Sequence, residues 1–110
     1  AFTPTVSFSE LSEEQWNTAV GVNLTGAFLL DKHALPWLRR SESGVIIHVA
    51  SQLGHVAVPG QAAYCATKAA LIHLSRAMAA DLADELSRCP DIRVITLDPD
   101  DPHVGLNREP

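Results

Sequence analysis

The sequence contains few basic residues and no long apolar run. Eight Lys and Arg residues stand against thirteen Asp and Glu residues, so the net charge of the 110-residue chain is -5 at pH 7. Because nucleic-acid binding needs a basic surface, this balance argues against a nucleic-acid partner. No apolar stretch approaches the ~18 residues of a membrane span, and the first residues lack a signal-peptide pattern. We therefore expect one small cytoplasmic domain with no membrane or nucleic-acid partner.

Disulfide and metal-ligand patterns are also absent from the sequence. The two cysteines, Cys65 and Cys89, do not have Cys-x-x-Cys spacing, so we expect free thiols. The five histidines do not have the spacing of a zinc site, and we expect no metal site. His48 lies within an apolar run, where we expect it to be packed or hydrogen-bonded.

The sequence does contain a tyrosine and a lysine four residues apart, Tyr64 and Lys68. On a helix this spacing places a phenol and an ammonium on one face, one turn apart. A nearby cation favours the phenolate and lowers the pKa of a phenol toward neutral pH, where the group can exchange protons. The Ser51 hydroxyl, thirteen residues before Tyr64, can hydrogen-bond the oxygen that this proton reaches. The three residues suit proton transfer at a carbonyl or alcohol oxygen.

Two apolar runs separated by a helical pattern predict a βαβ unit. The expected elements are a strand at 44–50, a loop at 52–60, a long helix at 61–86 and a strand at 92–97. This order predicts a parallel strand pair in an α/β fold. Ligands in such sheets bind beyond the carboxyl ends of the strands, and Ser51 and Pro99 lie at two such ends.

The first forty residues predict a long amphipathic helix. Its apolar residues recur every three or four positions, at Trp16, Val20, Leu24, Ala27, Phe28 and Leu35. Ser9 can cap the start of this helix, and Ser12 with Gln15 offers a capping box as an alternative start. Pro36 is expected to kink or shorten its last turn.

In these segments the chain resembles the short-chain dehydrogenase/reductase family, from near the N-terminus to about Pro99. Four segments carry the likeness: the helix motif Asn23-Leu24-Thr25-Gly26-Ala27-Phe28, the serine strand Gly44 to Ser51, the active-site helix motif Tyr64-x-x-x-Lys68, and the strand and nicotinamide-covering loop that run from Ile92 to Pro99. The fold implied is a partial Rossmann-like, doubly wound parallel sheet. Its order here is long helix, strand, long helix, strand.

The resemblance implies an oxidoreductase that transfers a hydride between NAD or NADP and a carbonyl or alcohol substrate. Tyr64 would be the general acid/base, Lys68 would lower the pKa of that tyrosine and bind the nicotinamide ribose, and Ser51 would orient the substrate oxygen. Asn23 would hold, through a helix irregularity, a water that links Lys68 to solvent. The implied cofactor contacts are Asn23, Tyr64, Lys68 and Pro99. Pairing of the two long helices with their copies implies a homodimer or homotetramer.

Two departures from the family pattern bear on what this chain does alone. No Gly-x-x-x-Gly-x-Gly or Gly-x-Gly-x-x-Gly turn is present, so we expect the N-terminal strands and the residue that selects NAD or NADP to be missing. Asp100 replaces the family's glycine after Pro99, and residues 100–110 are expected to form an irregular or disordered tail after a catalytic segment at 1–99.

Three functional hypotheses follow from these observations. The first is the oxidoreductase, with the isolated 110-residue chain itself expected to be inactive because the phosphate-binding turn is missing. The second is a non-catalytic remnant that acts as an oligomerisation module through its helices. The third is a serine hydrolase acting through Ser51, although its flanking residues are not a Gly-x-Ser-x-Gly elbow.

Overall fold

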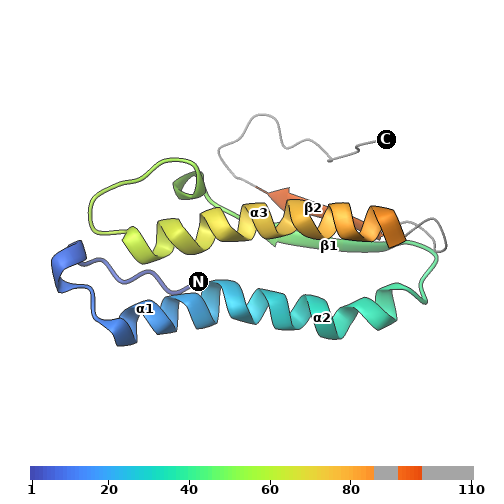
Figure 1. The fold of residues 1–110 in the computed structure, drawn as a ribbon, viewed down its shortest axis with the longest axis horizontal. Helices are drawn as coiled ribbons and strands as arrows, with labels where there is room; N and C mark the ends of the chain where they lie inside the picture. Colours follow the sequence, from blue (N-terminus) through green and yellow to red (C-terminus); the bar gives the residue numbers. More distant parts are fainter. Residues whose placement is uncertain (86–91, 98–110) are drawn as a thin grey trace.

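The computed structural model describes residues 1–85 and 92–97, which form two long helical runs beside a pair of strands (Figure 1). The helices and strands of the described residues are α1 (Glu13–Val20), a π-helical segment (Gly21–Thr25), α2 (Gly26–Leu38), β1 (Gly44–Val49), α3 (Ala62–Glu85) and β2 (Ile92–Leu97), with short 3-10 turns at Phe8–Glu10 and Gln52–Gly54. The predicted α/β order of long helix, strand, long helix and strand is confirmed.

The first helical run begins where the capping box places it. The Ser12 hydroxyl accepts a hydrogen bond from the Gln15 backbone N–H at 3.1 Å, and the Gln15 side chain accepts one from the Ser12 N–H at 3.0 Å. These bonds satisfy two of the donors that every helix start leaves unpaired. Ser9 lies inside the preceding 3-10 turn, so the alternative start at Ser9 is wrong.

The helical run contains a π-helical irregularity in its middle and a proline near its end. Residues 21–25 form a π-helical segment that joins α1 to α2 without a break. Pro36 lies inside α2, and the helix continues to Leu38, so the helix extends two residues past the proline. The irregularity predicted from the family resemblance around Asn23 is therefore present.

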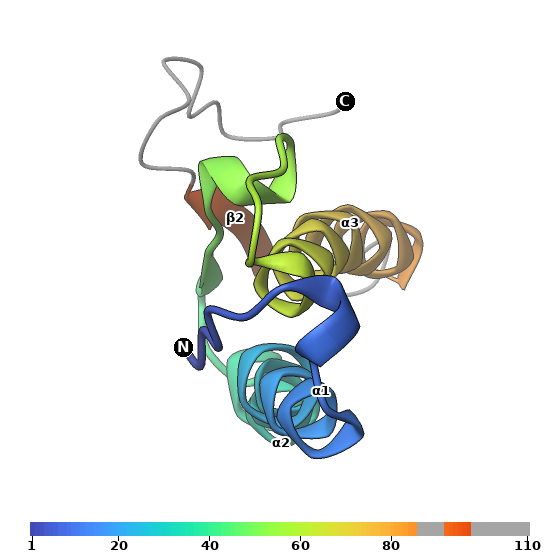
Figure 2. The ribbon, with the colours of Figure 1, turned by 90° about the vertical axis from the view of Figure 1, so that its left-hand side faces the viewer.

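Both long helices cover the same face of the two-stranded sheet (Figure 2). β1 and β2 are parallel, with Gly44 opposite Ile92 and Val49 opposite Leu97. Burial alternates along β1, because Gly44, Ile46 and His48 face the helices while the residues between them do not. Ile46, Leu82 and Val94 form the buried core, with Leu35, Leu38, Met78 and Ala79 packed against it.

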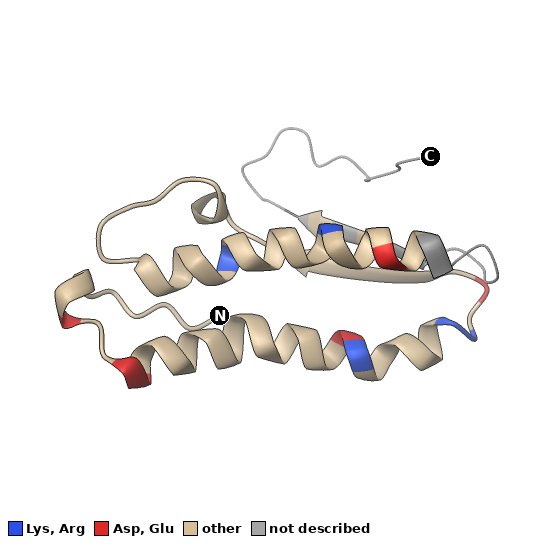
Figure 3. Cartoon of the chain, in the orientation of Figure 1, with Lys and Arg blue, Asp and Glu red and all other residues tan. Residues whose placement is uncertain are grey.

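The opposite face of β1 carries Val45, Ile47 and Val49, all exposed. Few positions along the two long helical runs are Lys, Arg, Asp or Glu, as the colouring of Figure 3 shows. None of the helices within residues 1–85 is long and apolar enough to cross a membrane. The predicted tail at 100–110 and the second cysteine, Cys89, lie outside the described residues. Cys65 is a free, half-buried thiol.

Candidate active site

The carboxyl end of β1 and the first turns of α3 bring three of the predicted residues into one region. Val49 ends the strand, and Ser51 follows with extended backbone, φ -158°. The Ser51 hydroxyl accepts a hydrogen bond from the Leu53 backbone N–H at 3.2 Å. This bond caps the 3-10 turn Gln52–Gly54 and fixes the serine at the strand end, where open α/β sheets bind ligands.

Lys68 crosses from α3 to this strand end. Its ammonium donates a hydrogen bond to the Val49 carbonyl at 2.8 Å, and the residue is only 7% exposed. Burial lowers the pKa of Lys68 from its ordinary value of 10.5, because a charged group is disfavoured away from water. No other Asp, Glu, Lys or Arg occurs from Ser43 to Ser75, so Lys68 is the one residue of this stretch of sequence with a side chain that is ordinarily charged at pH 7.

Tyr64 lies one helical turn before Lys68, as its spacing predicts. The Lys68 Nζ is 5.6 Å from the centroid of the Tyr64 ring, within the range of a cation–π contact. Tyr64 is half-buried. The predicted arrangement of a phenol beside an ammonium is thus present on α3.

Gly54 permits the close approach of the 3-10 turn to α3. A Cβ at Gly54 would lie 2.6 Å from Ile72 Cδ1, 3.1 Å from the Lys68 backbone carbon and 3.2 Å from the Lys68 carbonyl oxygen. Two of these atoms belong to helix backbone, which cannot swing away. The turn that follows Ser51 is therefore held directly against the residue that carries the ammonium.

Asn23 joins three segments of the chain around the same helix. Its side-chain oxygen accepts from the Phe2 N–H at 2.6 Å, and its side-chain nitrogen donates to the Phe2 carbonyl at 2.7 Å. The same nitrogen lies 3.2 Å from the Thr67 hydroxyl, which donates to the Tyr64 carbonyl at 2.9 Å. Asn23 thus connects the N-terminal segment and the π-helical segment to the turn of α3 between Tyr64 and Lys68.

The sequence did not single out some of these polar contacts. Thr67 was missed because a threonine in an alanine-rich helix carries no signal of its own, and Phe2 contributes only its backbone. His48 was expected to be packed or hydrogen-bonded, which is confirmed: it contacts Asp31 and Ser75. Pro99, the remaining predicted cofactor contact, lies outside the described residues.

Comparison with known proteins assigns this arrangement to a family. A sequence model of the short chain dehydrogenases matches residues 1–102. The chain belongs to this family. A 2,5-dichloro-2,5-cyclohexadiene-1,4-diol dehydrogenase of Sphingobium indicum is 42% identical over 92 residues, which are 84% of this chain and 35% of that protein. Family membership favours the oxidoreductase hypothesis over the serine hydrolase.

Solved structures of short-chain dehydrogenases show the same fold. A 4-hydroxyisoleucine dehydrogenase complexed with NADH is 30% identical, with a TM-score of 0.77, over 87% of this chain and 40% of that chain. A gluconate 5-dehydrogenase of Burkholderia cenocepacia, in complex with NADP and tartrate, is 26% identical, with a TM-score of 0.80, over 89% of this chain and 36% of that chain. The chain spans about a third of the length of the curated relatives it matches.

The site residues fit one part of a nicotinamide nucleotide. An ammonium has three N–H donors, and one of those of Lys68 is directed to Val49 within the described residues. The remaining donors suit the hydroxyl groups of a ribose, and the half-buried Tyr64 ring beside them suits a flat apolar group. The glycine-rich turn that would bind the pyrophosphate is not part of the sequence.

Proposed function

We propose that this chain carries the catalytic residues of an oxidoreductase that uses NAD or NADP to interconvert a carbonyl and an alcohol. The observation that carries the proposal is the buried Lys68 ammonium, bonded to the Val49 carbonyl and 5.6 Å from the centre of the Tyr64 ring. A buried cation held beside a phenol at a strand end suits acid/base work rather than stabilisation of the fold. Membership of the short-chain dehydrogenase family supports the same reaction class.

Lys68, Tyr64 and Asn23 would hold the cofactor, together with Pro99. When bound, the nicotinamide accepts or supplies the hydride. The Lys68 ammonium would donate hydrogen bonds to the ribose hydroxyls of the cofactor. The choice between NAD and NADP belongs to residues outside this segment.

Tyr64 would move the proton, and Ser51 would place the reacting oxygen. In the reductive direction the Tyr64 hydroxyl gives its proton to the carbonyl oxygen of the substrate, and in the oxidative direction the phenolate removes the alcohol proton. The Ser51 hydroxyl would donate a hydrogen bond to the same oxygen and stabilise the charge that develops on it. Its bond from the Leu53 N–H uses a lone pair of the serine oxygen and leaves the hydroxyl proton available.

Asn23 would act through the helix irregularity that contains it. Its side chain is engaged with Phe2 and Thr67, which fixes the π-helical segment against α3. A π-helical segment displaces backbone carbonyls from their usual partners, and such segments occur frequently at functional sites. A water held by this backbone would link the Lys68 ammonium to solvent and complete a route for the proton.

The acid/base role is tested by Tyr64→Phe in the complete native protein that carries these residues. Loss of one hydroxyl should reduce carbonyl reduction with NADH or NADPH by about a hundredfold or more, the usual contribution of a general acid. Ala66→Ser, two residues along the same helix at an exposed position, serves as the control and should keep the native rate. If Tyr64→Phe retained turnover within a few-fold of native, the assignment of Tyr64 would be wrong.

The alternative of an oligomerisation module also has an observation in its favour. Leu24, Thr25 and Phe28 of the first helical run and Ala70, His73, Leu74 and Ala77 of α3 line an apolar groove of about 480 Å³. Trp37 and Leu30 are also largely exposed on α2. These helices would pair with their copies in a homodimer or homotetramer, whether or not the site turns over substrate.

A further inference from the structure

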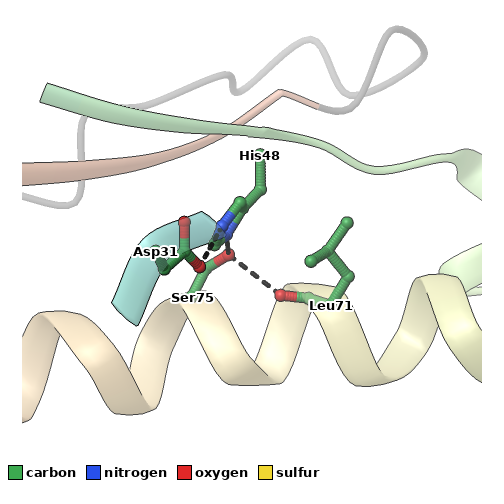
Figure 4. A network of polar contacts seen from close by, with 4 residues as sticks. All are labelled: Asp31, His48, Leu71 and Ser75. Atoms are coloured by element: carbon green, nitrogen blue, oxygen red, sulfur yellow. Dashed lines mark hydrogen bonds and ion pairs between the residues drawn. The ribbon is translucent and has the colours of Figure 1, made fainter. Parts of the chain in front are cut away.

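A second polar cluster lies between β1 and the two long helices, next to the candidate active site. The proposed mechanism does not use it. The His48 ring is 6% exposed and faces the helices from β1. Its Nε2 lies 2.8 Å from the Asp31 carboxylate of α2, and its Nδ1 lies 2.6 Å from the Ser75 hydroxyl of α3 (Figure 4). One imidazole therefore connects the strand to both helices.

The hydrogen-bond chemistry of this cluster fixes the direction of one bond. An ionised carboxylate only accepts, so the Nε2–H of His48 donates to Asp31. Ser75 has a single hydroxyl proton, and its oxygen also lies 2.9 Å from the Leu71 carbonyl. Either Ser75 donates to that carbonyl and accepts from a doubly protonated ring, or Ser75 donates to Nδ1 of a neutral ring. Both arrangements keep the bond between His48 and Ser75.

Serine, histidine and aspartate are also the residue types of a hydrolytic triad, but this cluster is not suited to that reaction. Ser75 is 3% exposed and lies in the middle of α3, so a substrate carbonyl has no access to its hydroxyl. The cluster therefore acts on the position of the elements it joins.

Two adjacent residues of β1 are bonded to one face of α3. His48 contacts Ser75, and the carbonyl of the next residue, Val49, accepts from Lys68. Lys68 and Ser75 are seven residues apart, which is close to two full helical turns, so they lie on the same face. The two bonds together fix where the strand end lies along the helix axis.

We propose that His48 is a positioning residue for Lys68: its bond to Ser75 holds the end of β1 where the Val49 carbonyl receives the Lys68 ammonium. The proposal rests on the catalytic role of Lys68 proposed above. Without the bond between His48 and Ser75, the end of β1 can shift along α3. The Lys68 ammonium then loses the Val49 carbonyl as a fixed acceptor and becomes accessible to water. Lys68 then lies less well placed beside Tyr64, and small misplacements of catalytic groups reduce turnover strongly.

Two conservative substitutions separate the two bonds of His48. His48→Asn keeps a polar atom near the position of Nδ1, and so retains the contact with Ser75. His48→Gln keeps a polar atom near the position of Nε2, and so retains only the contact with Asp31. Ser75→Ala removes the α3 partner directly and is a second way to break the same bond. Ile46→Val, on the same face of β1, weakens packing but removes no hydrogen bond and is the control for stability alone.

The first readout is the titration of Lys68, followed by NMR in lysine-labelled complete protein. This chain has two lysines, and the exposed Lys32 provides a reference signal. We expect His48→Gln and Ser75→Ala to raise the pKa of Lys68 toward its ordinary value, because the ammonium becomes hydrated. His48→Asn and Ile46→Val should leave this titration as in the native protein.

The second readout is the pH profile of turnover with NADH or NADPH. Asp31 of α2 is the charged group that faces His48, α3 presents Ser75, and Thr96 stands opposite in β2. His48→Gln and Ser75→Ala should lower kcat roughly tenfold to a hundredfold with KM nearly unchanged, and should displace the pH profile. His48→Asn should keep kcat and the pH profile close to those of the native protein.

The outcomes separate the positioning proposal from the proposed function. If His48→Gln and Ser75→Ala lowered thermal stability, as Ile46→Val does, but left the Lys68 titration native, His48 would be a structural residue only and the proposal would fail. If the native protein showed no nicotinamide-dependent turnover, the proposed function would fail, while the Lys68 titration would still decide whether His48 positions the ammonium.

Discussion

At the scale of single residues, the candidate site depends on the buried ammonium of Lys68 and on a glycine, Gly54, in the turn after Ser51. Lys68 brings an ammonium into a region that has no other Asp, Glu, Lys or Arg from Ser43 to Ser75. Gly54 lets the turn after Ser51 approach the backbone of Lys68 directly. Neither feature is favourable for folding by itself, because burying a charge and fixing the flexible backbone of a glycine both cost free energy. Both features lie at the carboxyl end of β1, where Lys68 contacts Val49 and Gly54 approaches α3.

The buried ammonium makes stability depend on pH in a definite direction. The folded-state pKa of Lys68 lies below its ordinary value of 10.5, so between these two values the unfolded chain binds more protons. The contribution of Lys68 to stability is therefore lost as pH falls through the lowered pKa and fully present above 10.5. We expect the free energy of unfolding of the native protein, relative to Lys68→Met, to rise with pH across this window. Urea unfolding at a series of alkaline pH values measures it, and a flat or falling difference would contradict the burial.

A methyl group at Gly54 should separate the turn from α3. Gly54→Ala places a carbon 2.6 Å from Ile72 Cδ1 and close to the Lys68 backbone, so the turn or the helix must move. We expect a loss of about 1–3 kcal/mol in the free energy of unfolding, which is typical of overpacking. Gly21→Ala is the matched control, because nothing lies within 4 Å of its added carbon. Equal effects of the two substitutions in urea unfolding would rule out the close approach.

At the scale of elements, local signals explain where helices and strands begin, and long-range contacts explain how they are joined. The capping box at Ser12 fixes the start of α1, and the apolar β-branched runs correspond to β1 and β2. The π-helical segment between α1 and α2 is tied to the N-terminal segment through Asn23. The positions of these elements relative to each other thus depend on a few polar side chains that span the layers.

The capping box should contribute measurably to the stability of α1. Ser12→Ala removes the acceptor of the Gln15 N–H, and we expect a loss of about 1 kcal/mol in the free energy of unfolding. Ser9→Ala should cost no more than a few tenths, because the Ser9 hydroxyl makes an exposed contact with Ser7 and caps no helix. Chemical unfolding of both variants gives the comparison. A larger effect at Ser9 would mean that the first helix starts earlier than the structure places it.

The helices and strands can be predicted from the sequence, but the hydrogen bonds that join them can be predicted only in part. β2 was predicted at the observed bounds, and the helix around Tyr64 was predicted within one residue at each end. The polar pairs that connect β1 to α3 are separated by 19 residues for Lys68 and Val49 and by 27 for His48 and Ser75. Such bonds leave no periodic signal, because each partner looks like an ordinary residue of its own element. Pro36 was expected to kink or shorten the last turn of its helix, and α2 ends two residues beyond it, at Leu38.

At the scale of the whole molecule, the described residues form one layer of sheet covered on one face. The side chains of Val45, Ile47 and Val49 point away from the helices and are exposed. Parallel sheets are usually covered on both faces, and the solved relatives are longer than this chain. Among the described residues, the exposed strand face and the groove between the long helices are apolar surfaces left open to solvent.

The groove between the long helices should control assembly. Phe28→Glu places a charge in this groove, and two copies related by a two-fold axis would bring two such charges together. We expect the dissociation constant of the oligomer to rise about a hundredfold or more in sedimentation experiments. Phe8→Glu, on the exposed 3-10 turn, is the matched control and should assemble as the native protein does. If Phe28→Glu assembled normally, the paired-helix interface would be wrong.

The most direct test of the central claim is to follow the transferred hydrogen. The complete native protein would be incubated with NADH or NADPH deuterated at the reactive carbon and with a panel of cyclic ketones, keto acids and sugar-derived ketones. Mass spectrometry then detects deuterium in the alcohol product. The account predicts deuterium on the new alcohol carbon with the native protein and with Ala66→Ser, and almost none with Tyr64→Phe. Alcohol formed without deuterium, or labelled equally by Tyr64→Phe, would contradict it.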